Sequence, residues 1–209
     1  MTQNNMEIIL HRINTIEGLR KIPLQYGVEI DVREDLKLSH DPTRYVKGSK
    51  LASLKNYLKE YDRAGHKGTI VFNIKATGIE EEVMQLAAEN NIENYFLLDV
   101  EMPYLYKASL KGVNKMAVRY SEYEPIQFVD NFRGNGSKGG KLDWVWIDSA
   151  TELPLDKDIV KRLEGFKTCL VSPDRWGRPE DIPQYIKQMS ALSFKLDAVM
   201  TEYKYAHLW

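Results

Sequence analysis

Eight short apolar runs alternate with segments of helical periodicity along the whole chain of 209 residues. The runs are rich in Val, Ile and aromatic residues, as β-strands are, and they occupy residues 7–12, 28–34, 69–76, 95–101, 115–122, 143–150, 168–173 and 197–203. Helical segments fill the gaps between them, at 15–25, 49–65, 79–90, 103–112, 125–132, 157–166 and 180–194. This alternation predicts parallel strands joined by helical crossovers.

Eight such units predict a (β/α)8 barrel, or TIM barrel, of the α/β class. The chain ends at Trp209, soon after the last run, so we expect the eighth helix to be short or missing. We expect a single compact domain over residues 1–209, since no linker interrupts the alternation. The segment 131–143 is rich in glycine but fits neither a P-loop nor a GxGxxG spacing, which favours a loop. Glycines expected to end helices are Gly27, Gly65 and Gly112.

Composition narrows the classes of function. The formal net charge of −1 lacks the basic excess of an electrostatic nucleic-acid binder, so we expect no nucleic-acid partner. No apolar run approaches the roughly 20 residues of a membrane span, and the first residues do not have the pattern of a signal peptide. The single cysteine, Cys169, excludes an intramolecular disulfide and a cysteine-cluster metal site. We therefore expect a cytoplasmic protein.

Chemically versatile side chains occur where the predicted strands end, which is where barrel enzymes place their active sites. Glu29 and Asp31 lie two residues apart in one strand and so project to the same face, opposite the apolar residues between and beside them. Two carboxylates this close repel each other, and a divalent cation with oxygen ligands is the simplest way to stabilise them. Asn73 and Lys75 repeat the spacing on the next strand.

Further polar and aromatic residues stand at or beyond other strand ends. Taken singly, His11 could be a core histidine and His40 a turn residue, but their positions after the first and second strands favour a shared functional site. Arg119 and Trp146 are candidate substrate contacts, with packing an equal alternative for Trp146. The remaining candidates are Asp99, Glu101, Asp148, Glu202, Tyr104, Tyr120, Trp176 and Tyr203.

The motifs HRIN, VEIDVRED with LSHDP, and FNIKA, in this order, resemble the glycerophosphodiester phosphodiesterase family of the phosphatidylinositol phospholipase C-like superfamily. The pattern of that family is HRG, ExDV, HD and ExK on a (β/α)8 barrel. The resemblance implies a metal-dependent phosphodiesterase acting on a small or lipid-derived, glycerophosphodiester-like substrate. The roles it implies are general acid and base for His11 and His40, phosphate contacts for Arg12 and Lys75, and ligands of Mg2+ or Ca2+ for Glu29, Asp31 and Asn73.

The chain departs from the family pattern at several positions. Ile13 replaces the glycine of HRG, the following PENT is echoed only by Asn14-Thr15, and the insertion after HD is absent. Asn73 is neutral where the family has an acidic ligand, so we expect weaker metal binding or compensation by Asp99. A non-catalytic relative that binds a phosphorylated ligand is therefore the alternative. A sugar-phosphate isomerase would leave the two histidines and two carboxylates unexplained.

Overall fold

A computed structural model of the chain describes residues 6–43, 50–134 and 136–209. Residue 49 of the helix expected at 49–65 and residue 135 of the loop expected at 131–143 lie outside the described residues. The chain forms two compact units. The N-terminal unit is Ile9–Glu101, and the C-terminal unit is Met1–Ile8 with Met102–Trp209, so that the boundary falls inside the first strand.

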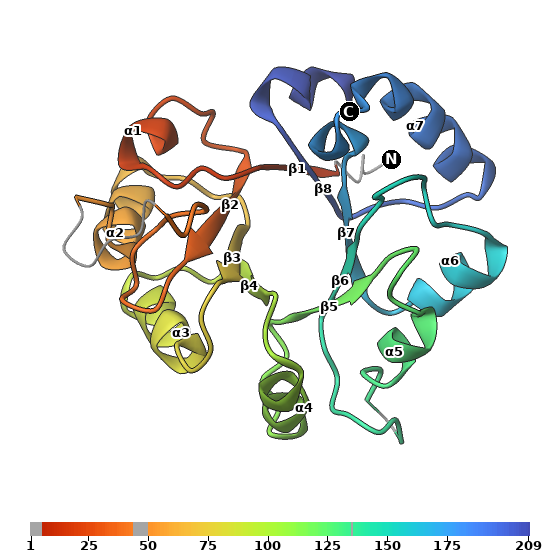
Figure 1. The fold of residues 1–209 in the computed structure, drawn as a ribbon, viewed down its shortest axis with the longest axis horizontal. Helices are drawn as coiled ribbons and strands as arrows, with labels where there is room; N and C mark the ends of the chain where they lie inside the picture. The colour runs from red at the N-terminus through yellow and green to blue at the C-terminus, as the bar shows by residue number, and fades with distance from the viewer. Residues whose placement is uncertain (1–5, 44–49, 135) are drawn as a thin grey trace. The chain divides into compact units, whose positions relative to one another are not determined.

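The N-terminal unit contains a parallel sheet in the order β4-β3-β2-β1 (Figure 1, red to yellow). Asp31 on β2 is in register with Asn73 on β3. Every residue of β2 is buried, as is expected for a strand of a parallel sheet that is covered on both faces. The elements are β1 (Glu7–Leu10), α1 (Ile16–Leu19), β2 (Gly27–Val32), α2 (Leu54–Ala64), β3 (Ile70–Ile74), α3 (Glu80–Glu89) and β4 (Tyr95–Leu98).

The C-terminal unit contains the parallel strands β8-β7-β6-β5 in this order (Figure 1, green to blue). Its helices and strands are α4 (Met102–Leu110), β5 (Ala117–Tyr120), α5 (Ile126–Asp130), β6 (Trp144–Ile147), α6 (Lys157–Leu163), β7 (Lys167–Val171), α7 (Ile182–Ala191) and β8 (Ala198–Thr201). Two 3-10 turns, η1 (Pro173–Trp176) and η2 (Pro179–Asp181), follow β7. In place of an eighth α-helix the chain ends in the 3-10 helix η3 (Tyr203–Leu208), as expected.

Local chemistry explains where several elements begin and end. Ser53 caps α2 by accepting a hydrogen bond from Asn56 N, and Gly65 ends it in a left-handed conformation at φ 80°. The first helix is shorter than expected and ends at Leu19. Pro23 lacks an N–H and disfavours helical backbone before it, so the chain turns and Gly27 opens β2 instead of ending a helix.

The glycine-rich segment 131–143 carries no helix or strand in its described part. At Gly140 a Cβ would lie 1.9 Å from the backbone oxygen of Ser109 in α4, so only glycine fits there. The loop therefore packs closely against α4.

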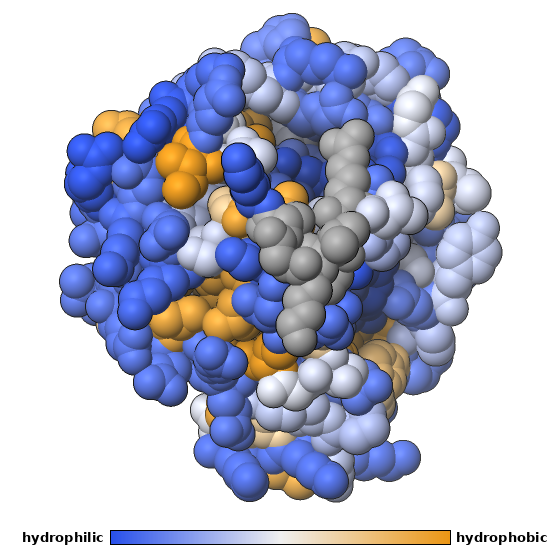
Figure 2. Space-filling view, turned by 60° about the vertical axis from the view of Figure 1, so that its left-hand side comes forward, coloured by the Kyte–Doolittle hydropathy of each residue, from blue (hydrophilic) through white to orange (hydrophobic). Residues whose placement is uncertain are grey.

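In the view of Figure 2, the hydrophobic side chains of the described residues form separate patches among hydrophilic ones. Among the residues that the structure describes, no helix has the length and apolar character needed to cross a membrane. The alternation of eight parallel strands with helices agrees with the predicted α/β class and element order.

Candidate active site

The N-terminal unit brings together most of the predicted site residues at the C-terminal ends of β2, β3 and β4. Glu29 and Asp31 lie on β2, Asn73 lies on β3, and Lys75 and Asp99 directly follow β3 and β4. The parallel register that pairs Asp31 with Asn73 places the strand ends side by side. The resulting cluster joins carboxylates, an amide and an ammonium group.

Glu29 is almost completely buried and both of its carboxyl oxygens accept hydrogen bonds. Asn73 Nδ2 donates to Oε1 at 2.8 Å, and the backbone N–H of Arg12 donates to Oε2 at 2.8 Å. Arg12 has a left-handed backbone at φ 57°, which folds the turn after β1 over the end of β2. Burial, followed by the charge of Asp31, raises the pKa of Glu29 to about 7.

Asp31 has no solvent exposure and is held from three sides. Asn14 Nδ2 donates to Oδ2 at 2.8 Å, while Nδ1 of His40 and Nζ of Lys75 lie 3.2 and 3.5 Å from Oδ1. Burial alone would raise the pKa of Asp31, but the Asn14 hydrogen bond and the Lys75 charge, with His40, lower it overall. The two neighbouring carboxyls therefore have pKa values moved in opposite directions, a common property of acid–base sites.

A tight turn brings His40 to the end of β2. Val32 and Leu38 form an antiparallel bridge, and Ser39 N donates to the backbone oxygen of Asp31 at 3.1 Å. Arg33 donates to the backbone oxygens of Ser39 and His40 and so supports the turn. His40 turns Nδ1 toward Asp31, and 45% of its side chain is exposed.

Lys75 lies between two carboxylates. Its Nζ is 3.5 Å from Asp31 Oδ1 and 3.3 Å from Asp99 Oδ2. Asp99 itself has a left-handed backbone at φ 58°, a conformation that is uncommon outside glycine and concentrates at functional sites. The structure thus joins Asp99, a secondary candidate from the sequence, directly to the predicted phosphate contact.

The other predicted residues have different surroundings. His11 is half-buried in the turn that it shares with Arg12. Arg119 and Trp146 belong to the C-terminal unit, where Arg119 pairs with Asp148 at 2.7 Å and Trp146 is 3% exposed in β6. Packing is therefore the role that burial indicates for Trp146.

Asn14 is a site residue that the sequence reasoning did not assign. Its Nδ2 donates to the Asp31 carboxylate, and its Oδ1 accepts from the Asp31 backbone N–H at 2.7 Å. The available signal was a polar side chain two residues after His-Arg at a strand end. That signal shows the position but not the partner, which depends on the turn after β1.

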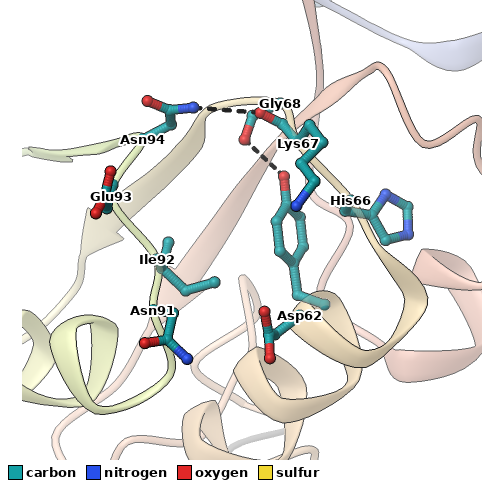
Figure 3. A pocket seen from close by; sticks show the side chains of 9 residues that line it. Asp62, His66, Lys67, Gly68, Asn91, Ile92, Glu93 and Asn94 are labelled. Carbon is teal, nitrogen blue, oxygen red and sulfur yellow. Dashed lines mark hydrogen bonds between the residues drawn. The ribbon is translucent and has the colours of Figure 1, made fainter.

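A separate pocket of about 200 Å³ lies at the opposite ends of the strands, before β3 and β4 (Figure 3). Tyr61 lines it, donates to the backbone oxygen of Gly68 at 2.6 Å and stacks on His66 with ring centroids 4.9 Å apart. This end of barrel strands generally serves stability. We therefore place the candidate active site at the carboxylate cluster.

The donor set of the cluster fits a hard divalent cation in its chemistry. Among the described residues, no group of three or more His, Cys, Asp and Glu side chains could hold a metal ion. Glu29 and Asp31 nevertheless supply carboxylate oxygens, and Oδ1 of Asn73 is buried without a hydrogen-bond partner. Such oxygens are the ligands that Mg2+ and Ca2+ prefer. An amide rotation would exchange the nitrogen and oxygen of Asn73 beside Glu29.

Comparison with known proteins places this geometry on a known fold. No family model matches the chain, and no curated protein matches its sequence. A protein from Agrobacterium tumefaciens described as a glycerophosphoryl diester phosphodiesterase matches in structure with a TM-score of 0.63 at 12% identity, over 97% of this chain and 96% of its own. The glycerophosphodiester phosphodiesterase of Thermotoga maritima matches with a TM-score of 0.60 at 17% identity, over 94% of both chains.

The chain has the fold of these two proteins. The predicted (β/α)8 barrel class is therefore confirmed, and it is the fold that the motif resemblance implies.

Proposed function

We propose that this protein is a divalent-metal-dependent phosphodiesterase that cleaves a glycerophosphodiester-like or related small or lipid-derived phosphodiester. The observation that carries the proposal is the contact of His40 with Asp31 inside the cluster of Glu29, Asn73 and Lys75. The cluster brings together an imidazole, carboxylate and amide oxygens, and an ammonium group. It does so on the fold of two proteins described as phosphodiesterases.

Glu29, Asp31 and Asn73 would hold the cation, which when bound would polarise the phosphoryl group and offset negative charge. The charge balance supports this role. Lys75 Nζ pairs with the carboxylates of Asp31 and Asp99, and the Glu29 carboxyl lies in the same cluster through Asn73. A phosphodiester anion would be repelled by this arrangement unless a cation were added. The proposed ion is Mg2+ or Ca2+.

The protein's own residues would bind the phosphate and move the protons. Lys75 and Arg12 would contact its non-bridging oxygens, where negative charge increases in the transition state. Because Asp31 fixes Nδ1 of His40, the other ring nitrogen would exchange a proton with the attacking or leaving oxygen. His11 would serve as the second member of the acid–base pair. A cytoplasmic location is part of the same proposal.

A hydrolysis assay tests this function directly. Bis(p-nitrophenyl) phosphate and glycerophosphodiesters should be cleaved in the presence of Mg2+ or Ca2+ and not after EDTA treatment. His40→Ala should reduce kcat by about 100-fold or more, as expected for a general acid or base. The matched control is His207→Ala, which removes an exposed histidine of η3 and should leave activity unchanged.

Absence of hydrolysis with saturable binding of a phosphodiester would favour the alternative, a phospho-ligand-binding protein. The neutral Asn73 is the observation that favours that alternative. Equal activity of the His40→Ala variant and the wild type would contradict the proposed role of His40.

A further inference from the structure

Helix α4 of the C-terminal unit exposes three apolar side chains to solvent. Met102 is 42% exposed, Tyr106 is 40% exposed and Leu110 is 56% exposed. Their spacing of four residues places them in one row about 12 Å long, because each helical residue adds roughly 1.5 Å. The opposite side of α4 is buried through Leu105 and Ala108. Grouped apolar side chains at the surface, unlike scattered ones, indicate an interaction site. We call the three residues the apolar stripe.

Two lysines follow one side of the apolar stripe. Lys107 and Lys111 are both exposed and lie four residues apart, so they form a second row along the helix. Successive residues of a helix are about 100° apart, which places Lys107 about 100° from Tyr106 around the helix axis. No acidic residue occurs within α4. This side of the stripe is therefore positively charged.

The glycine-rich segment 131–143 brings two more lysines to the other side. Ser109 is about 60° from Tyr106 around the axis, in the direction away from the first lysine row. Its Oγ accepts a hydrogen bond from Gly140 N at 3.1 Å, and the close approach of the two backbones leaves no space for a Cβ at this glycine. Lys138 and Lys141, both exposed, stand on either side of this contact in the sequence. The glycines thus allow a basic segment to lie against α4.

The four lysines are available for a partner. Among the described residues, no ion pair involves any of them. The acids nearest in sequence are Glu101, which precedes α4 at the end far from the lysines, and Asp143, which accepts a hydrogen bond from Asn114 at 3.1 Å. The surface around the apolar stripe therefore has an excess of positive charge. Charge complementarity favours a partner that is anionic and also offers apolar contact.

We propose that α4 and the adjoining glycine-rich segment bind the surface of an anionic lipid bilayer. The apolar stripe would enter the boundary between headgroups and acyl chains, where tyrosine is a favoured side chain. The lysines on both sides would contact lipid phosphates. A nucleic acid would meet the lysines but would leave the stripe without apolar contact. This inference does not rest on the proposed phosphodiesterase activity, because the surface contains none of the residues assigned to it.

Co-sedimentation of the whole chain with lipid vesicles tests the proposal. Vesicles of phosphatidylcholine with about one-third phosphatidylglycerol should bind the chain saturably, and pure phosphatidylcholine vesicles should bind it about tenfold more weakly or worse. Added salt should weaken the binding, because it screens charges at the surface. A surface that serves an acidic protein instead would give no saturable binding to either kind of vesicle, and this result would overturn the proposal.

A pair of double variants separates local charge from the charge of the whole chain. Lys107→Gln combined with Lys111→Gln should weaken binding to the anionic vesicles by about tenfold or more. The matched control, Lys55→Gln combined with Lys59→Gln, removes the same charge from exposed positions of α2. It should change the affinity by about twofold or less. Equal losses in the two double variants would show attraction without a defined surface and would contradict the proposal.

The remaining parts of the surface are tested in the same way. Lys138→Gln combined with Lys141→Gln should weaken binding as strongly as the α4 double variant, about tenfold or more. Leu110→Ser should weaken it by about fivefold or more, because it removes apolar contact and no charge. Leu24→Ser, at a position that is 48% exposed and outside α4, is its control. Unaltered binding by Leu110→Ser would overturn the role of the apolar stripe. Thermal unfolding at the wild-type temperature confirms that each variant is folded.

Discussion

Asn14 binds Asp31 through two hydrogen bonds, one to the carboxylate at 2.8 Å and one from the backbone N–H at 2.7 Å. A single amide thus connects the turn after β1 both to the β2 backbone and to the side chain of a proposed metal ligand. Such a contact fixes the direction of the carboxylate. We therefore expect Asn14 to act as a positioning residue for Asp31.

Replacing Asn14 by alanine should lower metal affinity by about 10–100-fold, the usual effect of removing a residue that orients a ligand. Calorimetric titration with Mg2+ and Ca2+ measures this change in the absence of substrate. Leaving a buried carboxylate short of a partner should also cost about 1–3 kcal/mol in the free energy of unfolding. Asn56→Ala, at an exposed position of α2, is the control and should alter neither quantity appreciably.

Asn73→Asp should tighten metal binding, because it restores a third negative ligand. Two unit charges about 4 Å apart interact by roughly 4 kcal/mol at an effective dielectric constant of ~20, before the cost of desolvation. The same variant replaces the Asn73 donor to Glu29 by a carboxylate, so the metal-free protein should become less stable. A metal Kd equal to or higher than that of the wild type would show that Asn73 is not a ligand.

The pKa of Glu29 predicts how the stability of the metal-free protein depends on pH. Its folded-state pKa of about 7 lies above the ordinary value of 4.5, so the folded chain binds the proton more tightly than the unfolded chain. Stability from this group is complete below pH 4.5 and decreases as the pH rises to about 7. At pH 8 in EDTA, the free energy of unfolding of Glu29→Gln should exceed that of the wild type by roughly 1–3 kcal/mol. Urea denaturation measures this difference.

The control for this prediction is the same pair of proteins at acidic pH. There Glu29 is protonated in both folded and unfolded chains, and the stabilising effect of Glu29→Gln should vanish. Saturating Ca2+ or Mg2+ should stabilise the wild type at pH 8 more than the variant. A constant difference between the two proteins at all pH values would contradict the raised pKa of Glu29.

Glu60, a residue of α2 that is only 8% exposed, predicts an opposite pH dependence. Hydrogen bonds from Arg63 in α2 and then from Arg20, the residue that follows α1, lower the pKa of Glu60 to about 2. This interaction stabilises the fold above pH 4.5, and the stabilisation is lost as the pH falls through about 2. Thermal unfolding should show a lower Tm for Glu60→Gln at pH 7, with the difference shrinking toward pH 2. Lys55→Gln, at an exposed position of α2, should show no such pH-dependent difference.

Periodicity alone determined the order and type of the elements. All eight strands lie within the ranges expected from the apolar runs, apart from Gly27 and Lys167, which begin β2 and β7 one residue early. Periodicity predicted the lengths of the helices less well. The segment 15–25 has helical spacing, but only Ile16–Leu19 is helical, because turn formation before Pro23 competes with helix extension.

The side-chain spacing of Glu29, Asp31, Asn73 and Lys75 was sufficient to predict a shared polar cluster, because parallel strands bring their C-terminal ends together. The partner of each group was not predictable from sequence. The left-handed backbone at Arg12 turns a main-chain N–H toward Glu29, and the bridge between Val32 and Leu38 brings His40 to Asp31. These contacts depend on φ and ψ angles of loop residues, which apolar periodicity does not encode.

The same division holds for the C-terminal unit. The strand-end positions of Arg119, Asp148 and Trp176 followed from the element order, but the sequence did not show that one guanidinium serves two carboxylates or that Asp148 holds the Trp176 ring. The sequence by itself determined which side chains stand at the ends of the strands, because strand geometry repeats every two residues. Only the tertiary structure decided which of them meet, because residues 28 or 29 positions apart become neighbours through parallel pairing and the turns that follow each strand.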